Sequence, residues 1–529
     1  MKHAIFCVMG AALLLTAAWG CRKESDALTA YDYDESLVFE AAKTSFAAKF
    51  DIIWNGMNQY YALWDYEAEQ GLDWDAVYDT YYPKFQALDQ RGEDQTVTDE
   101  ELSALLEEVL GSFHDGHFNI DVLNHKTGTT VNCHPSLKSF NSRDDWKAAV
   151  STPLNLGYYA NPANGEVETD ADGNPIAEVC KTSVSFLLSR NLQTPGMGGY
   201  WMMARIEELE ALPSLSDYEA FELQNLNDLK LELRTLNGKS DKQALAIYNQ
   251  LQAKYSFLGI PGFDYIDPAF AKNGLEIKYA LLKGNIAYLG FNHFNLGAYL
   301  DDNESEEEFD MSNPLTRQLV VGARAIWQGW FDGIQTLHKA GKLGGVIIDV
   351  RGNTGGSVTD SRFVAGALAP GRYIHFGYQR FKRGTGRYEY SPLMEARLGN
   401  MSQPHEDVTD VPIAVLTNCA SVSMAESTAL SVKTLPKGKV IGKRSFGAIC
   451  ALCTNDLSSY NYSGYIGVEG VTPVFGCVPA MASFTLDKRI IESEGVTPDI
   501  EVDLDVAQFQ ATGRDTQLDR ALQYIRDGQ

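Results

Sequence analysis

Apolar residues recur at helical spacing near the start of the chain. The first stripe consists of Phe39, Phe46, Phe50, Ile53, Met57 and Tyr60. A second stripe follows Asp73, and a third follows Thr98–Glu101, where threonine and glutamate form a capping-box pattern. Spacing of three or four residues is typical of amphipathic helices. The pattern therefore predicts three short helices that pack their apolar faces together in a small bundle.

The pattern changes twice further along the chain. Residues 120–275 mix turn residues, such as DADGN at 170–174, with a polar helical stretch at 217–255, and we interpret them as an insertion of unknown fold. After residue 275, short apolar runs alternate with helical stretches at 314–340 and 423–435. The apolar runs are LEIKYALL, NIAYLGF, GVIIDV and VPIAVLT. This alternation predicts the strands and helices of an α/β core.

The first residues predict export. Lys2 and His3 precede the apolar run AIFCVMGAALLLTAAWG, which ends at Cys21 before polar residues. This is a signal-peptide pattern, and the run is too short for a convincing membrane-spanning helix. A small residue followed by cysteine resembles a bacterial lipobox, so we expect a lipid on Cys21. The alternative is a plain secretory signal cleaved nearby. A lipid anchor predicts the cell envelope, at the outer membrane of a Gram-negative bacterium, facing the periplasm or the surface.

Together these patterns predict a multidomain chain of mixed α+β and α/β class. The predicted segments are a signal peptide (1–20), a tether (21–35), an N-terminal helical domain (36–120), an insertion (121–275), an α/β core (276–505) and a C-terminal helix (506–529). A chain of 529 residues is too long for one compact core, which agrees with several domains.

Composition narrows the possible partners. The formal net charge is −26, so electrostatic repulsion disfavours binding to nucleic acid and to anionic lipid surfaces. No stretch after the signal peptide is long and apolar enough to span a bilayer. The N-terminal lipid is therefore the expected link to a membrane.

Two acidic stretches are weak candidates for metal binding. Asp170, Asp172 and Asn174 have the spacing of a calcium loop, but Pro175 stands where an EF-hand loop needs glycine. A turn is the better interpretation there. The run DDNESEEEFD at 301–310 predicts a solvated loop. We expect neither a metal ion nor a cofactor.

Six cysteines follow Cys21, and an exported chain could pair some of them as disulfides. Cys450 and Cys453 have the C-x-x-C spacing of a zinc or redox motif. No second such motif or nearby histidine pair accompanies them, so a buried thiol or a disulfide is the better interpretation.

A glycine-containing turn follows one predicted strand, in GVIIDVRGNTGGSV at 345–358. Gly355 and Gly356 lack a Cβ, so their N–H groups could approach a substrate oxygen. The alternative is an ordinary tight turn from strand to helix.

The stretch ASVSMAE at 420–426 repeats this layout of strand, small residues and helix. A serine at the helix start would place its hydroxyl where the helix dipole and the N–H of Met424 favour an oxyanion. Ser423 and Glu426 also form a capping-box pattern, which is the structural alternative. Neither Ser421 nor Ser423 lies in the G-x-S-x-G pattern of the α/β-hydrolases.

A nucleophilic serine needs a base, and the chain has only nine histidines. His114 and His117 lie in SFHDGHFNI, just beyond the third predicted helix. Either one could serve as the base or be an ordinary surface histidine.

Three segments resemble one known superfamily in the same order along the chain. DVRGNTGG (349–356) resembles a D-V/L-R-x-N-x-G-G segment, ASVSMAE resembles a nucleophile segment with glutamate three residues after serine, and RIIESEGVTPDIEV (489–502) resembles a closing E-x-x-G-V-x-P-D-I-x-V segment. The superfamily is that of the tricorn protease and the C-terminal processing peptidases, which are serine peptidases. YYALWDYEAEQGLDWDAVYDTYYPKF and the following HDGHF resemble the helical segment ahead of the tricorn core. The resemblance covers about 36–120 and 276–505.

The resemblance implies a catalytic role for three residues. Ser423 matches the nucleophile because Glu426 follows it by three residues, and Ser421 becomes a turn residue. His117 matches the histidine base of tricorn, and Glu492 matches the glutamate of the closing segment. The implied oxyanion donors are the N–H groups of Met424 and of Gly355 or Gly356.

The sequence departs from the superfamily in two places. The processing peptidases use a lysine base, and Ala448 occupies the matching position, which leaves Lys443 as the nearest lysine. Tricorn has a serine before its histidine, and this chain has Gly116. We therefore expect that Glu492 reaches His117 directly or through water, that Asp115 orients the ring, or that the site is impaired.

The resemblance implies a crotonase-like or ClpP-like α/β spiral core and hydrolysis of peptide bonds in peptides or proteins through an acyl-enzyme, as in endopeptidases or carboxy-terminal processing peptidases. The alternative is a catalytically impaired member that acts as a ligand-binding or peptide-binding lipoprotein.

Overall fold

The computed structural model describes most of the chain. The described residues are 35–135 and 275–528, apart from short breaks and residues 453–463, together with 177–180 and much of 205–258. Four predicted features lie outside them: the signal peptide (1–20), the lipidation site Cys21, almost all of the tether (21–35) and the turn at 170–174. No helix in the described part has both the length and the apolar character to cross a membrane.

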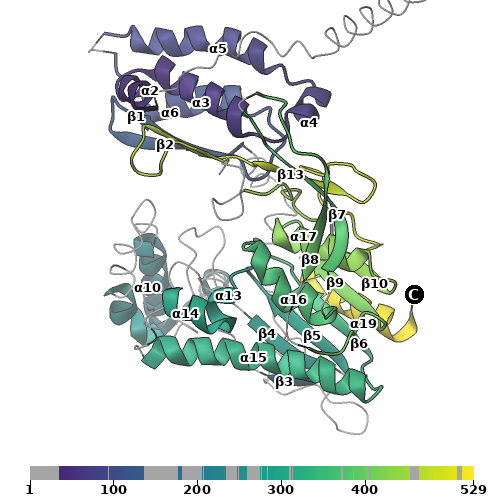
Figure 1. Cartoon of the computed structure of the whole chain (residues 1–529). Helices are drawn as coiled ribbons and strands as arrows, with labels where there is room; N and C mark the ends of the chain where they lie inside the picture. Colours follow the sequence, from purple (N-terminus) through teal and green to yellow (C-terminus); the bar gives the residue numbers. More distant parts are fainter. Residues whose placement is uncertain are drawn as a thin grey trace, which may run out of the picture.

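Helices dominate the N-terminal unit at the top of Figure 1. They are α2 (Glu35–Ala42), α3 (Phe46–Tyr60), α4 (Trp64–Glu69), α5 (Trp74–Asp89) and α6 (Asp99–Leu110). Side-chain oxygens of Ser45, Asp73 and Thr98 accept N–H groups at the starts of α3, α5 and α6. The three predicted helices are confirmed as α3, α5 and α6, and α2 and α4 lie beside them.

A four-stranded sheet completes the N-terminal unit. Its order is β11 (Tyr465–Ile466), β12 (Val474–Cys477), β1 (Asn119–Asn124) and β2 (Thr129–Cys133). The β1 strand pairs antiparallel with both β12 and β2. The unit therefore combines the N-terminal region with a segment more than 300 residues further along the chain, and the predicted domain boundary at residue 120 falls inside β1.

A seven-stranded sheet forms the core. Its order is β14 (Ile500–Glu501), β10 (Gly438–Gly442), β9 (Ile413–Thr417), β6 (Gly345–Asp349), β5 (Ile286–Phe291), β4 (Ile277–Leu282) and β3 (Ala177–Cys180). From β5 to β14 all neighbours are parallel, whereas β3, β4 and β5 pair antiparallel. The predicted strands of the α/β core are confirmed as β4, β5, β6 and β9.

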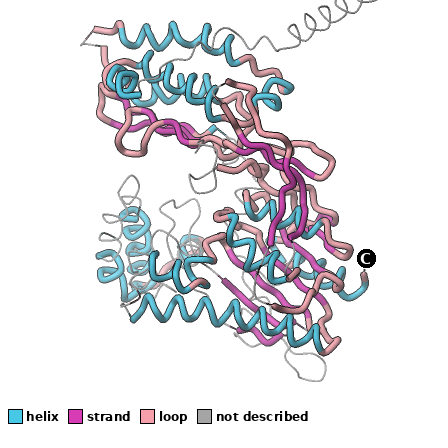
Figure 2. The backbone as a smooth tube through the Cα atoms, in the orientation of Figure 1, coloured by secondary structure: helices cyan, strands magenta, loops and turns pink. Residues whose placement is uncertain are grey.

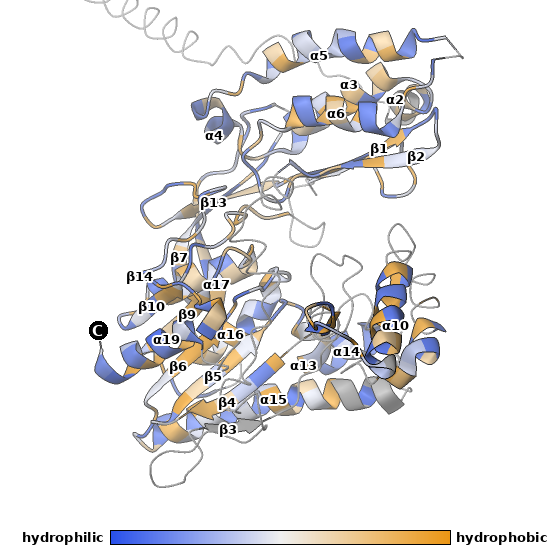
Figure 3. Cartoon of the chain, turned by 180° about the vertical axis from the view of Figure 1, so that it is seen from behind, coloured by the Kyte–Doolittle hydropathy of each residue, from blue (hydrophilic) through white to orange (hydrophobic). Residues whose placement is uncertain are grey.

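Helices cover both faces of this sheet, so its central strands β5, β6 and β9 are buried along their whole length. The helices are α15 (Pro314–Lys339), α16 (Ser361–Leu368), α17 (Met424–Lys433) and α19 (Thr516–Asp527). On β6, Val346 and Ile348 face the core shared with α15 and α17, whereas Ile347 faces the layer under α19. In Figure 3, polar and apolar residues alternate along surface helices such as α5 and α10 (Asp217–Leu233), as expected for amphipathic helices.

A third sheet connects the two units. Its strands are β13 (Met481–Thr485), β7 (Tyr373–Phe381) and β8 (Met394–Gly399), which pair antiparallel in that order. Figure 2 shows these strands running from the helical unit toward the core sheet. Arg380 of β7 donates to Asp65 of α4 at 2.7 Å, which ties the sheet to the N-terminal unit.

The acidic run 301–310 does not form the predicted solvated loop. Most of it is helix α14 (Asp302–Glu308), preceded by the short α13 (Gly297–Leu300). Asp301 accepts the N–H of Asn303 at 3.0 Å and so caps the helix start. Arg324 and Arg362 bind side chains of the run. These cations offset the repulsion between neighbouring carboxylates that made a loop the expected structure.

Candidate active site

Two loops meet at the carboxyl edge of the core sheet. One follows β6 and carries the DVRGNTGG segment, and the other follows β9 and ends at Ser423. Because β6 and β9 are parallel neighbours, their following loops lie side by side. The N–H of Val422 donates to the carbonyl of Asn353 at 2.9 Å, and Asn418 accepts the N–H of Gly352 at 3.0 Å. These bonds hold the predicted nucleophile against the predicted oxyanion loop.

Ser423 has an unusual backbone conformation, with φ +57° and ψ −111°. An ordinary N-cap residue lies in the extended region, and a positive φ is costly for a residue with a Cβ. Gly355 lies so close that a Cβ on it would be 2.7 Å from the Cβ of Ser423. Ser423 itself is half-buried at the start of α17. Strained residues held in this way concentrate at functional sites, so helix capping alone does not explain Ser423.

The contacts of Ser421, in contrast, indicate a structural role. It is fully buried, and its hydroxyl donates to the carbonyl of Val350 at 2.7 Å and accepts the N–H of Asn418 at 3.1 Å. Its hydroxyl therefore joins the two loops, as expected of a turn residue.

Glu426 organises the nucleophile turn from inside the protein. Its fully buried carboxyl accepts the N–H of Ser423 at 2.9 Å, the hydroxyl of Ser445 at 2.6 Å and the N–H groups of Gly447 and Ala448 at 2.8 Å each. Burial raises the pKa of this carboxyl, and the hydrogen bonds oppose that rise. The capping interaction with Ser423 is present, and it is one part of a larger network.

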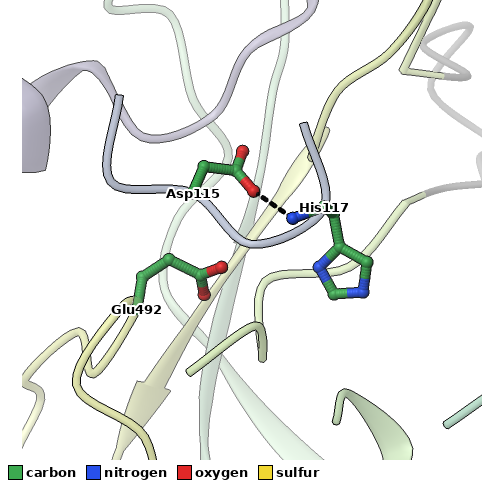
Figure 4. Close-up of side chains that lie close together, drawn as sticks. All are labelled: Asp115, His117 and Glu492. Atoms are coloured by element: carbon green, nitrogen blue, oxygen red, sulfur yellow. Dashed lines mark hydrogen bonds between the residues drawn. The ribbon is translucent and has the colours of Figure 1, made fainter. Parts of the chain in front are cut away.

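His117 lies on the loop between α6 and β1, beside two buried carboxyl groups. One polar atom from each of Asp115, His117 and Glu492 can be chosen so that all three lie within 4.8 Å of one another. Figure 4 shows the ring with one nitrogen toward the carboxyl groups and the other pointing away from them. A histidine base needs a carboxyl group near one ring nitrogen and a proton donor near the other, and the carboxyl groups are present here.

Gly116 marks the contact between the histidine loop and the core. A Cβ at this position would lie 2.2 Å from the Cβ of Ala448, so the loop approaches closely only with glycine. The N–H of Gly116 donates to Glu492 at 3.0 Å. A backbone group therefore makes the link to the glutamate at the position where tricorn has a serine.

This contact also links the loop of the predicted base to the turn of the predicted nucleophile. The N–H of Ala448 and the N–H of Ser423 donate to the same oxygen of Glu426. The histidine loop thus rests on a residue that shares a buried carboxylate with the nucleophile. The structure brings the histidine loop and the serine turn, which belong to different units, onto one network.

Burial shifts the acid–base properties of these side chains. It lowers the pKa of His117 to about 4, with a smaller contribution from His134, so the ring is neutral and can accept a proton near pH 7. Burial raises the pKa of Glu492 to about 8 and raises the pKa of Asp115 well above its usual range. Shifts of this kind are typical of functional sites.

The three side chains are also a donor set that a zinc ion could accept. Both oxygens of Glu492, however, already accept backbone N–H groups, from Gly116 on one side and from Ile449 and Cys450 on the other. The arrangement therefore fits a histidine held for proton transfer better than an open metal site.

The family comparison agrees with this geometry. Residues 286–502 match the model of peptidase family S41. This region belongs to peptidase family S41. The S41 region contains Ser423, Glu426 and Glu492, and it makes the chain a serine-type peptidase. His117 lies outside the matched residues, in the N-terminal unit.

Solved structures with some likeness to this chain are distant. A candidate peptidase from Parabacteroides merdae is 16% identical, with 91% of this chain and 96% of that chain covered and a TM-score of 0.42. Mature CPAF complexed with lactacystin is 12% identical, with 93% and 98% covered and a TM-score of 0.43. The tricorn protease is 16% identical, with 51% and 24% covered and a TM-score of 0.26. No curated protein matches the chain. At these scores the structural likenesses carry no argument, and the assignment rests on the family match and the motifs.

The predicted oxyanion donors differ in their present bonding. The N–H of Gly355 donates to the side chain of Asn353 at 2.8 Å, so it already has an acceptor. Gly356 is exposed, and Met424 is the first residue of α17. Gly356 and Met424 therefore remain the better-placed donors of the S41 site, and Gly355 provides the close approach to Ser423.

The S41 site has no lysine base at the position where the processing peptidases have one. Ala448 is fully buried at that position. Lys443 binds Glu501 and Asp503 at 2.8 Å each, on the surface beside β14. Those carboxylates raise the pKa of Lys443, so it is a poor proton acceptor.

Sequence reasoning missed several residues of the site. Glu426 was assigned only a capping role, and Tyr66, whose hydroxyl donates to the carbonyl of Glu492 at 2.8 Å, was assigned none. No local pattern marks Tyr66, because its partner is 426 residues away in the sequence. Among the described cysteines, Cys450 and Cys477 are free thiols. Cys453 lies outside the described residues, so the C-x-x-C motif stays untested.

Proposed function

We propose that this S41 peptidase cleaves peptide bonds through an acyl-enzyme on Ser423, with His117 as the base. The observation that carries the proposal is the strained Ser423 at the start of α17, packed against Gly355. A helix start offers free N–H groups and a favourable dipole to an anion. The crotonase-like spiral arrangement implied by the motifs is part of the same proposal.

The proposed reaction has two halves. The Ser423 hydroxyl attacks the substrate carbonyl carbon while its proton moves to the outward-facing nitrogen of His117. The N–H groups of Met424 and Gly356 stabilise the oxyanion, and His117 then gives the proton to the leaving amine. Water repeats the sequence to release the acyl group. Asp115 and Glu492 both lie on one side of the ring, and a carboxylate there supports the imidazolium that forms in each half. Acyl transfer of this kind requires no metal ion or cofactor.

A fluorophosphonate probe tests the proposal without a known substrate. The mature chain should become labelled, and Ser423→Ala should abolish labelling. Ser421→Ala is the matched control, because its hydroxyl holds the turn rather than reacting. It should lose about 1–3 kcal/mol of stability and still become labelled while folded. A folded wild-type chain that does not react would overturn the proposal and favour the alternative of a ligand-binding lipoprotein.

A further inference from the structure

We propose that Asp115, rather than Glu492, is the carboxyl group that positions His117 for proton transfer. This inference rests on the proposed function and names a further positioning residue of the same site. The motif resemblance points to Glu492 for this role, so the inference comes from the hydrogen bonds of the two carboxyl groups.

The bonds of Glu492 indicate a structural role. One of its oxygens accepts the N–H of Gly116 at 3.0 Å, and the other accepts the N–H groups of Ile449 and Cys450 at 3.0 Å each. The side chain is fully buried. Glu492 therefore fastens the histidine loop to the segment after Ala448 through three backbone groups. Neither of its oxygens is left without a donor.

The bonds of Asp115 leave one oxygen unused. Its side chain is 1% exposed, and Oδ1 accepts the N–H of His117 at 2.6 Å and that of Phe118 at 3.2 Å. Within the described part of the chain, Oδ2 of Asp115 and Nδ1 of His117 are both buried without a hydrogen-bond partner. A buried polar atom without a partner costs about 1–3 kcal/mol, so such atoms in a native protein call for an explanation.

These two unpaired atoms belong to neighbouring side chains. Asp115 and His117 belong to the group whose polar atoms come within 4.8 Å of one another, and Figure 4 shows one ring nitrogen on the carboxyl side. Pairing them requires a turn of the Asp115 carboxyl together with a ring rotation, or one bridging water. Catalytic hydrogen bonds are often long before substrate binds. An ionised Asp115 that accepts Nδ1–H leaves Nε2 free to take the proton of Ser423.

If Asp115 positions His117, the base and the carboxyl group that positions it lie on the same loop. Asp115 and His117 both lie between α6 and β1, and Oδ1 already fixes the backbone of that loop. The N-terminal unit would then supply a preassembled pair, whereas the core supplies the nucleophile. Glu492 would secure the contact between the two.

Two isosteric variants test the assignment. Asp115→Asn keeps an oxygen for the N–H groups of His117 and Phe118 but loses the acceptor for Nδ1. Its rate of fluorophosphonate labelling should fall by about 10³–10⁴, with the melting temperature unchanged or raised. Glu492→Gln places an amide NH₂ against backbone N–H groups. It should melt several degrees lower and, while folded, be labelled less than tenfold more slowly than wild type.

A pH profile separates positioning from a structural effect. Burial and the neighbouring Glu492 raise the pKa of Asp115, so wild-type labelling should lose rate at a higher pH than that at which His117 itself takes up a proton. Asp115→Asn should lack this upper limb and keep only the more acidic one that belongs to His117. If Asp115→Asn does not fold, Asp115→Ser supplies an oxygen for the turn without a carboxyl and should show the same loss of rate.

The possible outcomes distinguish this inference from the proposed function. Loss of labelling in Ser423→Ala, but not in Ser421→Ala, establishes the nucleophile. The Asp115 variants then show which carboxyl group positions His117. Wild-type rates in folded Asp115→Asn, or a slow but stable Glu492→Gln, would overturn the role of Asp115 and leave the proposed function intact. Absence of labelling in the wild-type chain would overturn both.

Discussion

At the residue scale, single atoms decide how closely the two halves of the site approach. Gly116 leaves room for Ala448, and Gly355 leaves room for Ser423. Gly355 has a φ of +84°, which already favours glycine in its own loop, whereas Gly116 is explained only by the segment that it contacts. Each one faces a segment that is distant in the sequence, and a Cβ on either would push the proposed base or the proposed nucleophile away.

Gly116 gives a prediction about packing. Gly116→Ala should destabilise the fold by about 1–3 kcal/mol, because the new Cβ would lie 2.2 Å from that of Ala448. Adding Ala448→Gly removes the obstacle and should recover part of the loss. Denaturant unfolding of the wild type, both single variants and the double variant measures the coupling. Strictly additive losses would show that the two residues do not compete for the same space.

His117 gives a prediction about pH. Burial lowers its folded-state pKa to about 4, whereas the ordinary value is 6.5. Between these values the unfolded chain binds a proton that the folded chain does not, so this residue makes the protein less stable as the pH falls from 6.5 to 4. His117→Gln should remove this slope, which is at most about 1.4 kcal/mol per pH unit. Unfolding free energies of both chains across this range should diverge toward acid, and parallel curves would contradict the shift.

At the scale of elements, the parallel strands β6 and β9 bring two loops together and α17 begins where they meet. Local sequence determines the strands and the helix, but Glu426 determines how the turn between them is held. Its four hydrogen bonds connect α17 to the segment 445–448, which in turn supports the histidine loop.

Glu426→Gln tests this connection. An amide would turn an NH₂ group toward N–H donors, so we expect a loss of about 2–3 kcal/mol and slower labelling of Ser423. The matched control is Glu501→Gln, which breaks only an exposed ion pair with Lys443 and should cost less than about 1 kcal/mol. Equal melting temperatures for the two variants would show that the buried network contributes nothing to holding the turn.

At the scale of the whole molecule, the site is composite. The proposed base comes from the N-terminal unit and the proposed nucleophile from the core, and contacts such as that of Tyr66 with the backbone of Glu492 join the two units. The proposed lipid anchor lies far outside these contacts in the sequence.

The anchor is therefore separable from the chemistry. Cys21→Ser should move the protein from the membrane fraction to the soluble fraction, since one lipidated residue is the proposed attachment. Its labelling rate should equal that of wild type, because the site residues lie between 115 and 492. Mass spectrometry of the mature N-terminus provides the control. Retention of Cys21→Ser in the membrane, with no diacylglyceryl on the wild type, would refute the lipoprotein proposal.

The sequence by itself determined the elements and the family. Apolar periodicity predicted α3, α5, α6 and the strands β4, β5, β6 and β9, because spacing within a few residues decides which face is buried. The motifs pointed to Ser423 and His117. They also excluded the lysine base of the processing peptidases, because Ala448 occupies its position. Only the tertiary structure decided the contacts between segments that are distant in the sequence, because local spacing carries no information about them. Arginines from elsewhere turned the acidic run into α14, β12 completed the sheet of β1, and Gly116 met Glu492 across 376 residues. The roles of Asp115 and Glu492 depend on which of their oxygens already have donors, and those donors come from segments brought together only by folding.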